Sequence, residues 1–342
     1  MKPIAPLLFK ALLFVTVTVL FFSCQKNGAD SLVAPPDNPP NTSTDVQVFK
    51  DVQYGVNKGF DEKDVDLKFD AYIPAYASAT QKFPLVLFVH GGGFTSGDKS
   101  NGSASMIQFA KSGFVGVTIN YRLNTAIDGD NMCSIPIRTT NESIYMAVQD
   151  TRAALRFLVA NAGKYHIDTS NIFLNGNSAG AITVLNTHFL NQADFEEMIP
   201  GVQLTRGGLN NAGNDLINTF TIKGIAANSG CLNDTKYIKS SNLLPVIFFH
   251  GTEDKVIPIE TGHIYSGDDN SCTSSQIVFG SAALYQTLVQ LGEPSVLHID
   301  PVGGHLSFSE NLTNSNELCF FNSVMNKITE SGIYTGQESS CK

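Results

Sequence analysis

A serine flanked by small residues lies in the segment Gly176-Asn177-Ser178-Ala179-Gly180. The apolar run Ile172–Leu174 before it predicts a strand, and Ala181–Leu190 after it predicts a helix. A serine at such a turn has strained backbone angles and an exposed hydroxyl, and the helix N-terminus directs amides at a developing anion. A loop that only packs a helix on a sheet would account for the glycines but not for the hydroxyl. Ser178 is therefore the candidate nucleophile.

A run of glycines follows the most apolar predicted strand, in His90-Gly91-Gly92-Gly93-Phe94. Successive glycines let the backbone turn its amides toward a ligand without obstruction by Cβ atoms. Attack of a hydroxyl on an ester creates a tetrahedral oxyanion, and each preorganised donor to it is worth roughly 2.7–4 kcal/mol. A phosphate nest is the alternative, but no Lys or Ser/Thr follows at the required spacing. We predict an oxyanion hole formed by the amides of Gly92, Gly93 and Ala179.

Four motifs in combination resemble the α/β-hydrolase superfamily. They are the two glycine segments above, a strand ending in Asn120-Tyr121-Arg122-Leu123, and Gln149-Asp150 within a predicted helix. Within the superfamily, roughly residues 46–330 resemble bacterial carboxylesterases of the feruloyl-esterase and acetyl-esterase type. Ala181 stands where many relatives have a further glycine, and no long helical cap precedes the glycine-rich strand. These two departures leave the substrate class open.

The resemblance implies the chain order Ser, Asp, His for a catalytic triad. By that order Asp254, in the loop after the predicted strand Leu243–Phe249, is the acid, with Glu253 as its rival. His305 follows the predicted strand Ser295–Ile299 and two glycines that free its loop, so it is the candidate base. The remaining histidines begin glycine turns, follow the acid too closely, or lie in or beside predicted elements.

Apolar runs that alternate with helical periods predict the elements that must position these side chains. The pattern is that of an α/β fold, a mostly parallel central sheet with helices on both faces. Val46–Tyr54 and Asp66–Ile73 alternate apolar and polar residues, which predicts an antiparallel opening pair. Helical spacing is clear over residues 142–161 and weaker over 277–291 and 317–329. Further strands are predicted at Leu85–Val89, Phe114–Asn120 and Phe220–Ala227, and an insertion over the sheet edge at 191–218.

The first residues predict export. Two lysines and a short apolar run, Ala11–Phe22, are typical of a secretory signal and too short to cross a bilayer of about 30 Å. The segment Phe21-Phe22-Ser23-Cys24 resembles a bacterial lipobox, which implies a signal peptide at 1–23 and lipidation of Cys24. Residues 24–45 predict a solvated tether, and 46–342 the catalytic domain. We expect a cell-envelope lipoprotein at the outer membrane or cell surface. Plain secretion or periplasmic release, and a retained anchor, are the alternatives.

Composition limits the partners. The net charge is −9, and removal of residues 1–23, which hold two lysines and no acid, would make it −11. Such a charge argues against a nucleic-acid partner. The five cysteines beyond Cys24 allow up to two disulfides and one remaining thiol, with the pairing open, and Cys231 is a candidate buried thiol. The cysteines concerned are Cys133, Cys231, Cys272, Cys319 and Cys341.

We expect neither a cofactor nor a metal. Asp268-Asp269-Asn270 lacks the rest of a calcium ligand set. The residues together predict a serine esterase that forms an acyl-enzyme and acts on small or carbohydrate-linked esters of acetyl or feruloyl type. A serine peptidase of the same fold and a non-catalytic binding lipoprotein are the alternatives. Loss of a triad member would mark the latter, and all three are present.

Overall fold

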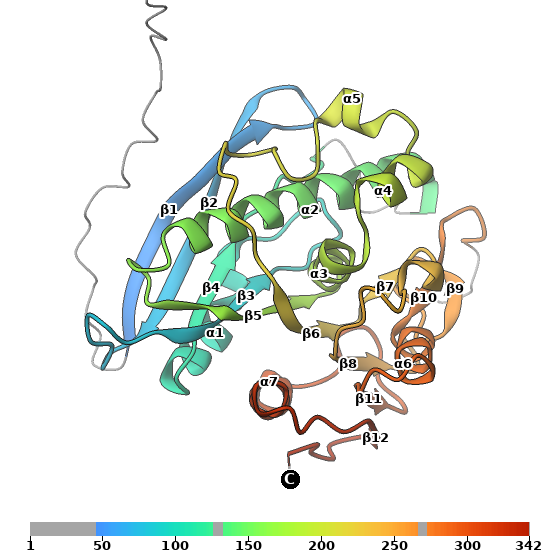
Figure 1. Cartoon of the computed structure of the whole chain (residues 1–342). Helices are drawn as coiled ribbons and strands as arrows, with labels where there is room; N and C mark the ends of the chain where they lie inside the picture. Colours follow the sequence, from blue (N-terminus) through green and yellow to red (C-terminus); the bar gives the residue numbers. More distant parts are fainter. Residues whose placement is uncertain (1–45, 126–132, 266–271, 342) are drawn as a thin grey trace, which may run out of the picture. The chain divides into compact units, whose positions relative to one another are not determined.

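Nine strands form one mixed sheet in the computed structural model, which describes residues 46–125, 133–265 and 272–341 (Figure 1). Their order is β1-β2-β4-β3-β5-β6-β8-β11-β12. β1 pairs with β2 and β2 with β4 in the antiparallel sense, and every later pair is parallel. The strands are β1 (Val46–Lys58), β2 (Asp64–Pro74), β3 (Phe83–Val89), β4 (Val115–Ile119), β5 (Ile167–Asn177), β6 (Ile222–Asn228), β8 (Val246–Gly251), β11 (Val296–Asp300) and β12 (Gly332–Thr335).

Helices cover both faces of this sheet, which confirms the predicted α/β class (Figure 1). On one face the strands share a core with α2, α3 and α6, and on the other with α1 and α7. Along β3, Leu85 and Leu87 belong to the first core, whereas Val86 and Phe88 belong to the second. This alternation explains why the strand is apolar throughout. The helices are α1 (Ser103–Lys111), α2 (Ile137–Ala160), α3 (Ala179–Phe189), α6 (Ser281–Gln290) and α7 (Glu310–Asn326).

The predicted strands are confirmed, including the antiparallel opening pair, but one predicted helix starts too early. Residues 277–280 form β10 (Ile277–Gly280), and only then does α6 begin. β10 lies between β7 (Cys231–Leu232) and β9 (Thr261–His263) in a small second sheet. These strands are two to four residues long, too short for their periodicity to be detected in the sequence. Their pairing depends on segments far apart in the chain.

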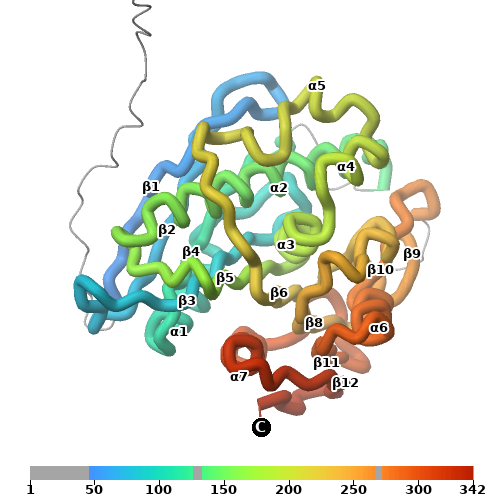
Figure 2. Tube along the Cα trace, viewed as in Figure 1, coloured from blue at the N-terminus to red at the C-terminus, as the bar shows by residue number. Residues whose placement is uncertain are grey.

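The predicted insertion at 191–218 contains two short helices, α4 (Gln192–Met198) and α5 (Val202–Arg206). It packs along α2, where the hydroxyl of Tyr145 donates to the carbonyl of Gly207 at 2.6 Å. It also reaches edge strand β1, since the amide of Val56 donates to the carbonyl of Gly213 at 2.9 Å. From there the connection runs past α2 to β6 (Figure 2). The insertion therefore covers one helix and the edge of the sheet.

Two disulfides form, Cys133–Cys272 and Cys319–Cys341, and Cys231 is a free, buried thiol. The two bridges among the described cysteines reach the predicted upper limit of two, and the structure supplies the pairing. No helix within the described ranges is long and apolar enough to span a membrane. The predicted signal peptide, the tether and Cys24 lie outside those ranges, as does Asp268-Asp269-Asn270.

Candidate active site

Ser178 occupies the sharp turn between β5 and α3. Its φ of 55° and ψ of −119° are strained for a residue with a Cβ. A Cβ at Gly180 would lie 1.9 Å from the carbonyl oxygen of Val89, and one at Gly176 would lie 2.5 Å from Gly180. The two glycines therefore let α3 begin directly against the ends of β3 and β5. The turn holds Ser178 at the carboxyl edge of the parallel strands, where ligands bind in α/β folds.

His305 lies within hydrogen-bonding distance of that serine. The distance between Ser178 Oγ and His305 Nε2 is 2.8 Å. The histidine belongs to the loop between β11 and α7, which lies against the loop after β8. A Cβ at Gly251 would lie 2.1 Å from the carbonyl oxygen of Gly303, and the amide of Glu253 donates to that same oxygen at 2.9 Å. This close approach places the two loops, which are about fifty residues apart in the sequence, directly against each other.

Asp254 completes a chain of three side chains. Its Oδ2 lies 2.8 Å from His305 Nδ1, and its Oδ1 accepts the amides of Val256 and Ile257 at 2.9 Å each. Burial raises the pKa of the carboxyl, but hydrogen bonds from His250 and His305 outweigh it and hold the pKa well below its ordinary value. The carboxylate therefore favours the imidazole tautomer with the proton on Nδ1, which leaves Nε2 free to accept the serine proton.

His250 contacts Asp254, a contact that the sequence did not lead us to predict. Its Nε2 lies 2.9 Å from the carbonyl oxygen of Ile257 and 3.2 Å from Asp254 Oδ2. The carbonyl can only accept, so Nε2 carries a proton, and Nδ1 lies 2.7 Å from Ser281 Oγ. The imidazole is fully buried, and its Nε2 contacts Oδ2 of Asp254, the same carboxylate oxygen that His305 contacts. The sequence feature that could have indicated this contact is the spacing of four residues between His250 and Asp254.

The glycine loop lies beside the serine. A Cβ at Gly91 would lie 3.3 Å from the Cβ of Ser178. Gly92 and Gly93 have positive φ values of 112° and 59°, which glycine adopts without strain. Within the described part of the chain, their amides donate to no other group. Ala179 is the first residue of α3, and its amide has no acceptor within the helix.

The structure thus places Ser178, Asp254 and His305 in one hydrogen-bonded chain, with the predicted oxyanion residues next to it. Glu253, the rival acid, is exposed and contributes its backbone amide rather than its carboxylate to the loop contact. The catalytic roles of Ser178, Asp254 and His305, and those of the oxyanion residues, stay predictions. Among the residues described, no cluster of three His, Cys, Asp or Glu side chains could hold a metal ion.

Known proteins match parts of this sequence. The BD-FAE family model matches residues 69–206, which include the glycine loop and Ser178. Carboxylesterase 3B of Mus musculus is 29% identical over 150 residues, 43% of this chain and 25% of that protein. The inactive carboxylesterase-like protein VdtD of Byssochlamys spectabilis is 28% identical over 171 residues, 47% of this chain and 28% of that protein. The match spans only about a quarter of the length of these curated relatives.

Solved structures match over most of the chain. A truncated carbohydrate esterase from gut microbiota superposes with a TM-score of 0.57 at 18% identity, over 84% of this chain and 99% of that one. Butyrate-bound esterase 2 of Thermogutta terrifontis gives a TM-score of 0.55 at 17% identity, over 83% and 95%. The chain has the α/β-hydrolase fold. These proteins are named as esterases or as carboxylesterase-like, and at these identities their likeness to this chain shows the fold.

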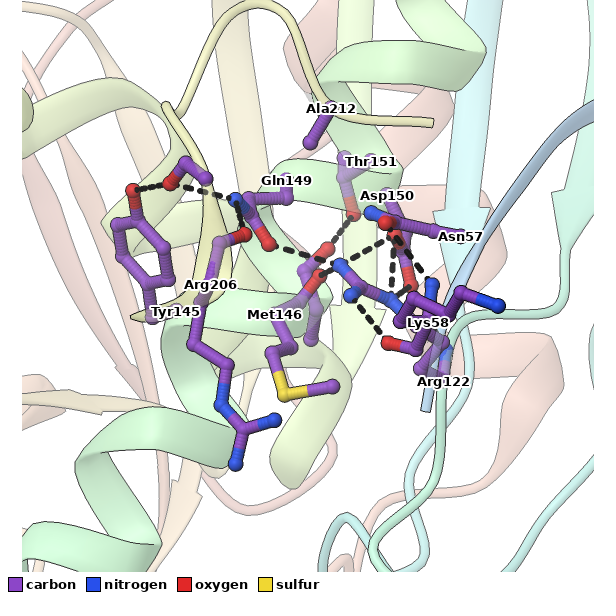
Figure 3. A network of polar contacts seen from close by, with 12 residues as sticks. Asn57, Lys58, Arg122, Tyr145, Met146, Gln149, Asp150, Thr151, Arg206 and Ala212 are labelled. Carbon is purple, nitrogen blue, oxygen red and sulfur yellow. Dashed lines mark hydrogen bonds and ion pairs between the residues drawn. The ribbon is translucent and has the colours of Figure 1, made fainter. Parts of the chain in front are cut away.

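In this α/β-hydrolase fold, Arg122 and Asp150, which belong to two of the motifs named in the sequence, connect several elements of the fold (Figure 3). Arg122 Nη2 lies 2.8 Å from Asp150 Oδ1, and both side chains are almost completely buried. Arg122 Nη1 also donates to the carbonyl of Lys58 at 2.9 Å, and Nη2 to Gln149 Oε1 at 2.8 Å. The pair therefore joins the loop after β4 to α2 and to the end of β1. The same loop bonds to the glycine segment, where the amide of Asn124 donates to the carbonyl of Phe94 at 2.7 Å.

Proposed function

We propose that this protein is a serine esterase that hydrolyses carboxylic esters through Ser178, His305 and Asp254. The observation that carries the proposal is the continuous chain of 2.8 Å contacts from Ser178 Oγ through the imidazole to Asp254. A serine hydroxyl is a weak nucleophile until a base is placed to accept its proton. Burial of Ser178 and Asp254 shields the chain from water, which strengthens its electrostatic interactions.

The proposed mechanism has two halves. As Ser178 Oγ attacks the ester carbonyl carbon, its proton passes to His305 Nε2, and Asp254 stabilises the resulting imidazolium. The amides of Gly92, Gly93 and Ala179 donate to the oxyanion. His305 then protonates the leaving alcohol, and an acyl-enzyme remains on Ser178. Water, deprotonated by His305, attacks this acyl group, and collapse of the second tetrahedral intermediate releases the acid and restores the serine.

The substrates that fit the proposal are small or carbohydrate-linked esters of acetyl or feruloyl type. Support comes from the names of the structural neighbours, a carbohydrate esterase and an esterase that binds butyrate. One sequence relative is named as inactive, so the competing hypothesis is a non-catalytic binding protein of this fold. The complete hydrogen-bonded chain in this protein favours the catalytic one.

The test compares hydrolysis of p-nitrophenyl acetate and butyrate by the wild type and Ser178→Ala. We expect kcat to fall by about 10³-fold or more, because the nucleophile is lost. Ser78→Ala, at an exposed serine outside the site, is the matched control and should retain full activity. An organophosphonate should label Ser178 alone. Equal rates for the wild type and Ser178→Ala would refute the proposal, and a panel of acetyl, feruloyl and long-chain esters would define the substrate.

We also propose that the chain is exported and that Cys24 carries the lipid, which would hold the catalytic domain at the cell envelope by a tether. Radiolabelled palmitate supplied to a bacterial host should label the wild type, and globomycin should block its processing. Cys24→Ser is the control and should remain unlabelled. A soluble, unlabelled wild-type product would contradict lipidation and leave plain secretion.

A further inference from the structure

A groove of about 570 Å³ lies away from the proposed active site. It is lined by the second half of α2, the C-terminal end of α3 and the connection that leads into β6, and its residues include Arg152, Arg156, Thr187 and Phe220. Ser178 precedes the first residue of α3, whereas Thr187 is near its last. At about 1.5 Å per helical residue, roughly 14 Å of helix separates them. The groove is therefore distinct from the triad.

Two arginines in this groove have no acidic partner among the residues that the structure describes. The sequence holds five arginines, and Arg122, Arg138 and Arg206 each form an ion pair with a carboxylate. Arg152 instead donates to Asn210 Oδ1 at 2.8 Å and to the carbonyls of Thr187 and Leu190 at 2.7 and 2.8 Å.

Arg156 likewise donates to Asn214 Oδ1 at 3.2 Å and to the carbonyl of Ala212 at 2.6 Å. No carboxylate of the described chain lies within 4.0 Å of either guanidinium. Two positive charges therefore share one groove, and no described residue supplies a counter-charge.

Three buried polar atoms of the same groove have no hydrogen-bond partner among the described residues. They are Arg152 Nε, Arg156 Nη1 and Thr187 Oγ1. Arg156 is only 3% exposed and Thr187 only 2%. A buried polar group that lacks a partner costs about 1–3 kcal/mol, and more when it is charged. Bonds to backbone carbonyls explain why the arginines hold the connection to α2 and α3, but they leave these three atoms unused.

The electrostatics of the groove agree with this geometry. Burial, followed by repulsion from Arg156, lowers the pKa of Arg152 to about 10, and burial lowers the pKa of Arg156. Both nevertheless stay cationic at neutral pH. His188, also in the groove, has its pKa lowered by burial and adds no charge at neutral pH. A positive site without internal neutralisation favours an anion.

We infer that this groove binds an oxyanionic group, a phosphate, sulfate or carboxylate, through Arg152, Arg156 and Thr187. A planar guanidinium matches the geometry of such groups, and its free N–H donors have fixed directions. The neighbouring Phe220 and the largely exposed Ile217 offer apolar surface for the rest of a ligand such as an acidic sugar. The inference is independent of the proposed esterase reaction.

Calorimetric titration of the whole protein with sodium phosphate, sodium sulfate and sodium glucuronate tests the inference. Glucose is the neutral control, and sodium chloride at matched ionic strength is the control for screening. Saturable binding of at least one oxyanion is expected, and the arm that binds most tightly identifies its chemistry. Arg156→Gln should weaken binding at least 10-fold.

Arg138→Gln, at an exposed arginine of the same helix, should change binding less than 2-fold. Thr187→Val keeps the size of the side chain and should weaken binding several-fold even if Arg156→Gln fails to fold. Ser178→Ala should bind as the wild type does, so the result is separate from the test of esterase activity. Absence of saturable binding beyond the chloride control, or unchanged binding by the Arg156 and Thr187 variants, would overturn the inference.

Discussion

At the scale of single residues, the two neighbouring acids Glu253 and Asp254 have opposite environments. Glu253 is exposed, whereas Asp254 is buried and accepts two backbone amides in addition to its histidine contacts. The amides fix the direction of the carboxylate, and through it the orientation of His305. The position of a carboxylate in its loop, rather than its charge, therefore decides which acid can act on the imidazole.

Asp254→Asn should reduce kcat for p-nitrophenyl acetate by about 10³–10⁴-fold, because an amide no longer stabilises the imidazolium or enforces its tautomer. Glu253→Gln is the matched control and should stay within a few-fold of the wild type. Steady-state kinetics on both variants, after circular dichroism has verified folding, makes the comparison. An active Asp254→Asn enzyme together with an inactive Glu253→Gln enzyme would transfer the role of the acid to Glu253.

Glu317 is a second buried carboxyl, outside the proposed reaction. It is 3% exposed and accepts a hydrogen bond from Asn175 Nδ2 at 2.7 Å. Burial raises its pKa from 4.5 to about 8. Between these two values the unfolded chain is ionised at this residue while the folded chain keeps its proton. The folded state then binds more protons, so its stability falls as the pH rises.

Glu317→Gln should remove this loss, which amounts to a few kcal/mol between about pH 4.5 and pH 8. The free energy of unfolding in urea, measured at pH 5 and pH 8, should therefore differ less in the variant than in the wild type. Glu310→Gln, in the exposed first turn of the same helix, should keep the wild-type difference. An unchanged pH dependence in Glu317→Gln would show that the residue does not titrate in this way.

At the scale of elements, the site depends on how closely three loops approach one another. α3 begins against β3 only because Gly180 lacks a Cβ, and the loops after β8 and β11 meet only because Gly251 does. Backbone atoms at these contacts cannot move aside as a flexible side chain can. Small residues here therefore position Ser178 and His305 through close backbone contacts.

Gly180→Ala should destabilise the fold by about 1–3 kcal/mol and also lower kcat, because the added Cβ forces the start of α3 away from Val89. Gly163→Ala is the control, since a Cβ there has open space around it. Urea unfolding and esterase assays on both variants provide the measurement. If Gly180→Ala were as stable and active as Gly163→Ala, this close approach would not constrain the site.

At the scale of the whole molecule, the disulfides fasten segments that the sheet alone does not hold. Cys319 of α7 is joined to Cys341, a separation of 22 residues, and the last strand, β12, lies in the loop that this bond closes. β12 is only four residues long and pairs with β11 alone. The bridge therefore keeps a weakly paired edge strand in place.

Replacing both Cys319 and Cys341 by serine should lower the free energy of unfolding by roughly 3 kcal/mol, the loop-closure value for a loop of this size. Thermal unfolding with and without dithiothreitol checks this. The reductant should lower Tm more in the wild type than in the double variant, because one of the two bridges is already absent there. Equal effects of the reductant on both proteins would show that this bridge does not stabilise the fold.

Local patterns were enough to predict the strands of the large sheet other than β12, the helix containing Asp150 and the two glycine segments. Alternation and helical spacing reflect burial along a single element, and a strained turn requires small residues at particular positions. Both kinds of signal can therefore be recognised within a short segment of the sequence. The candidate triad also followed from order along the chain, but only with the help of a family resemblance. Its members converge because parallel strands carry their loops to one edge of the sheet.

Contacts between distant segments could not be derived in this way. The pairing of the cysteines, the donation of His250 to Asp254, the small sheet around β10 and the groove of Arg152 and Arg156 all depend on which loops meet. The position of an arginine in the sequence does not show whether a carboxylate will lie beside it in the folded protein. That is decided only when the chain has packed, because burial and partners are properties of the folded molecule.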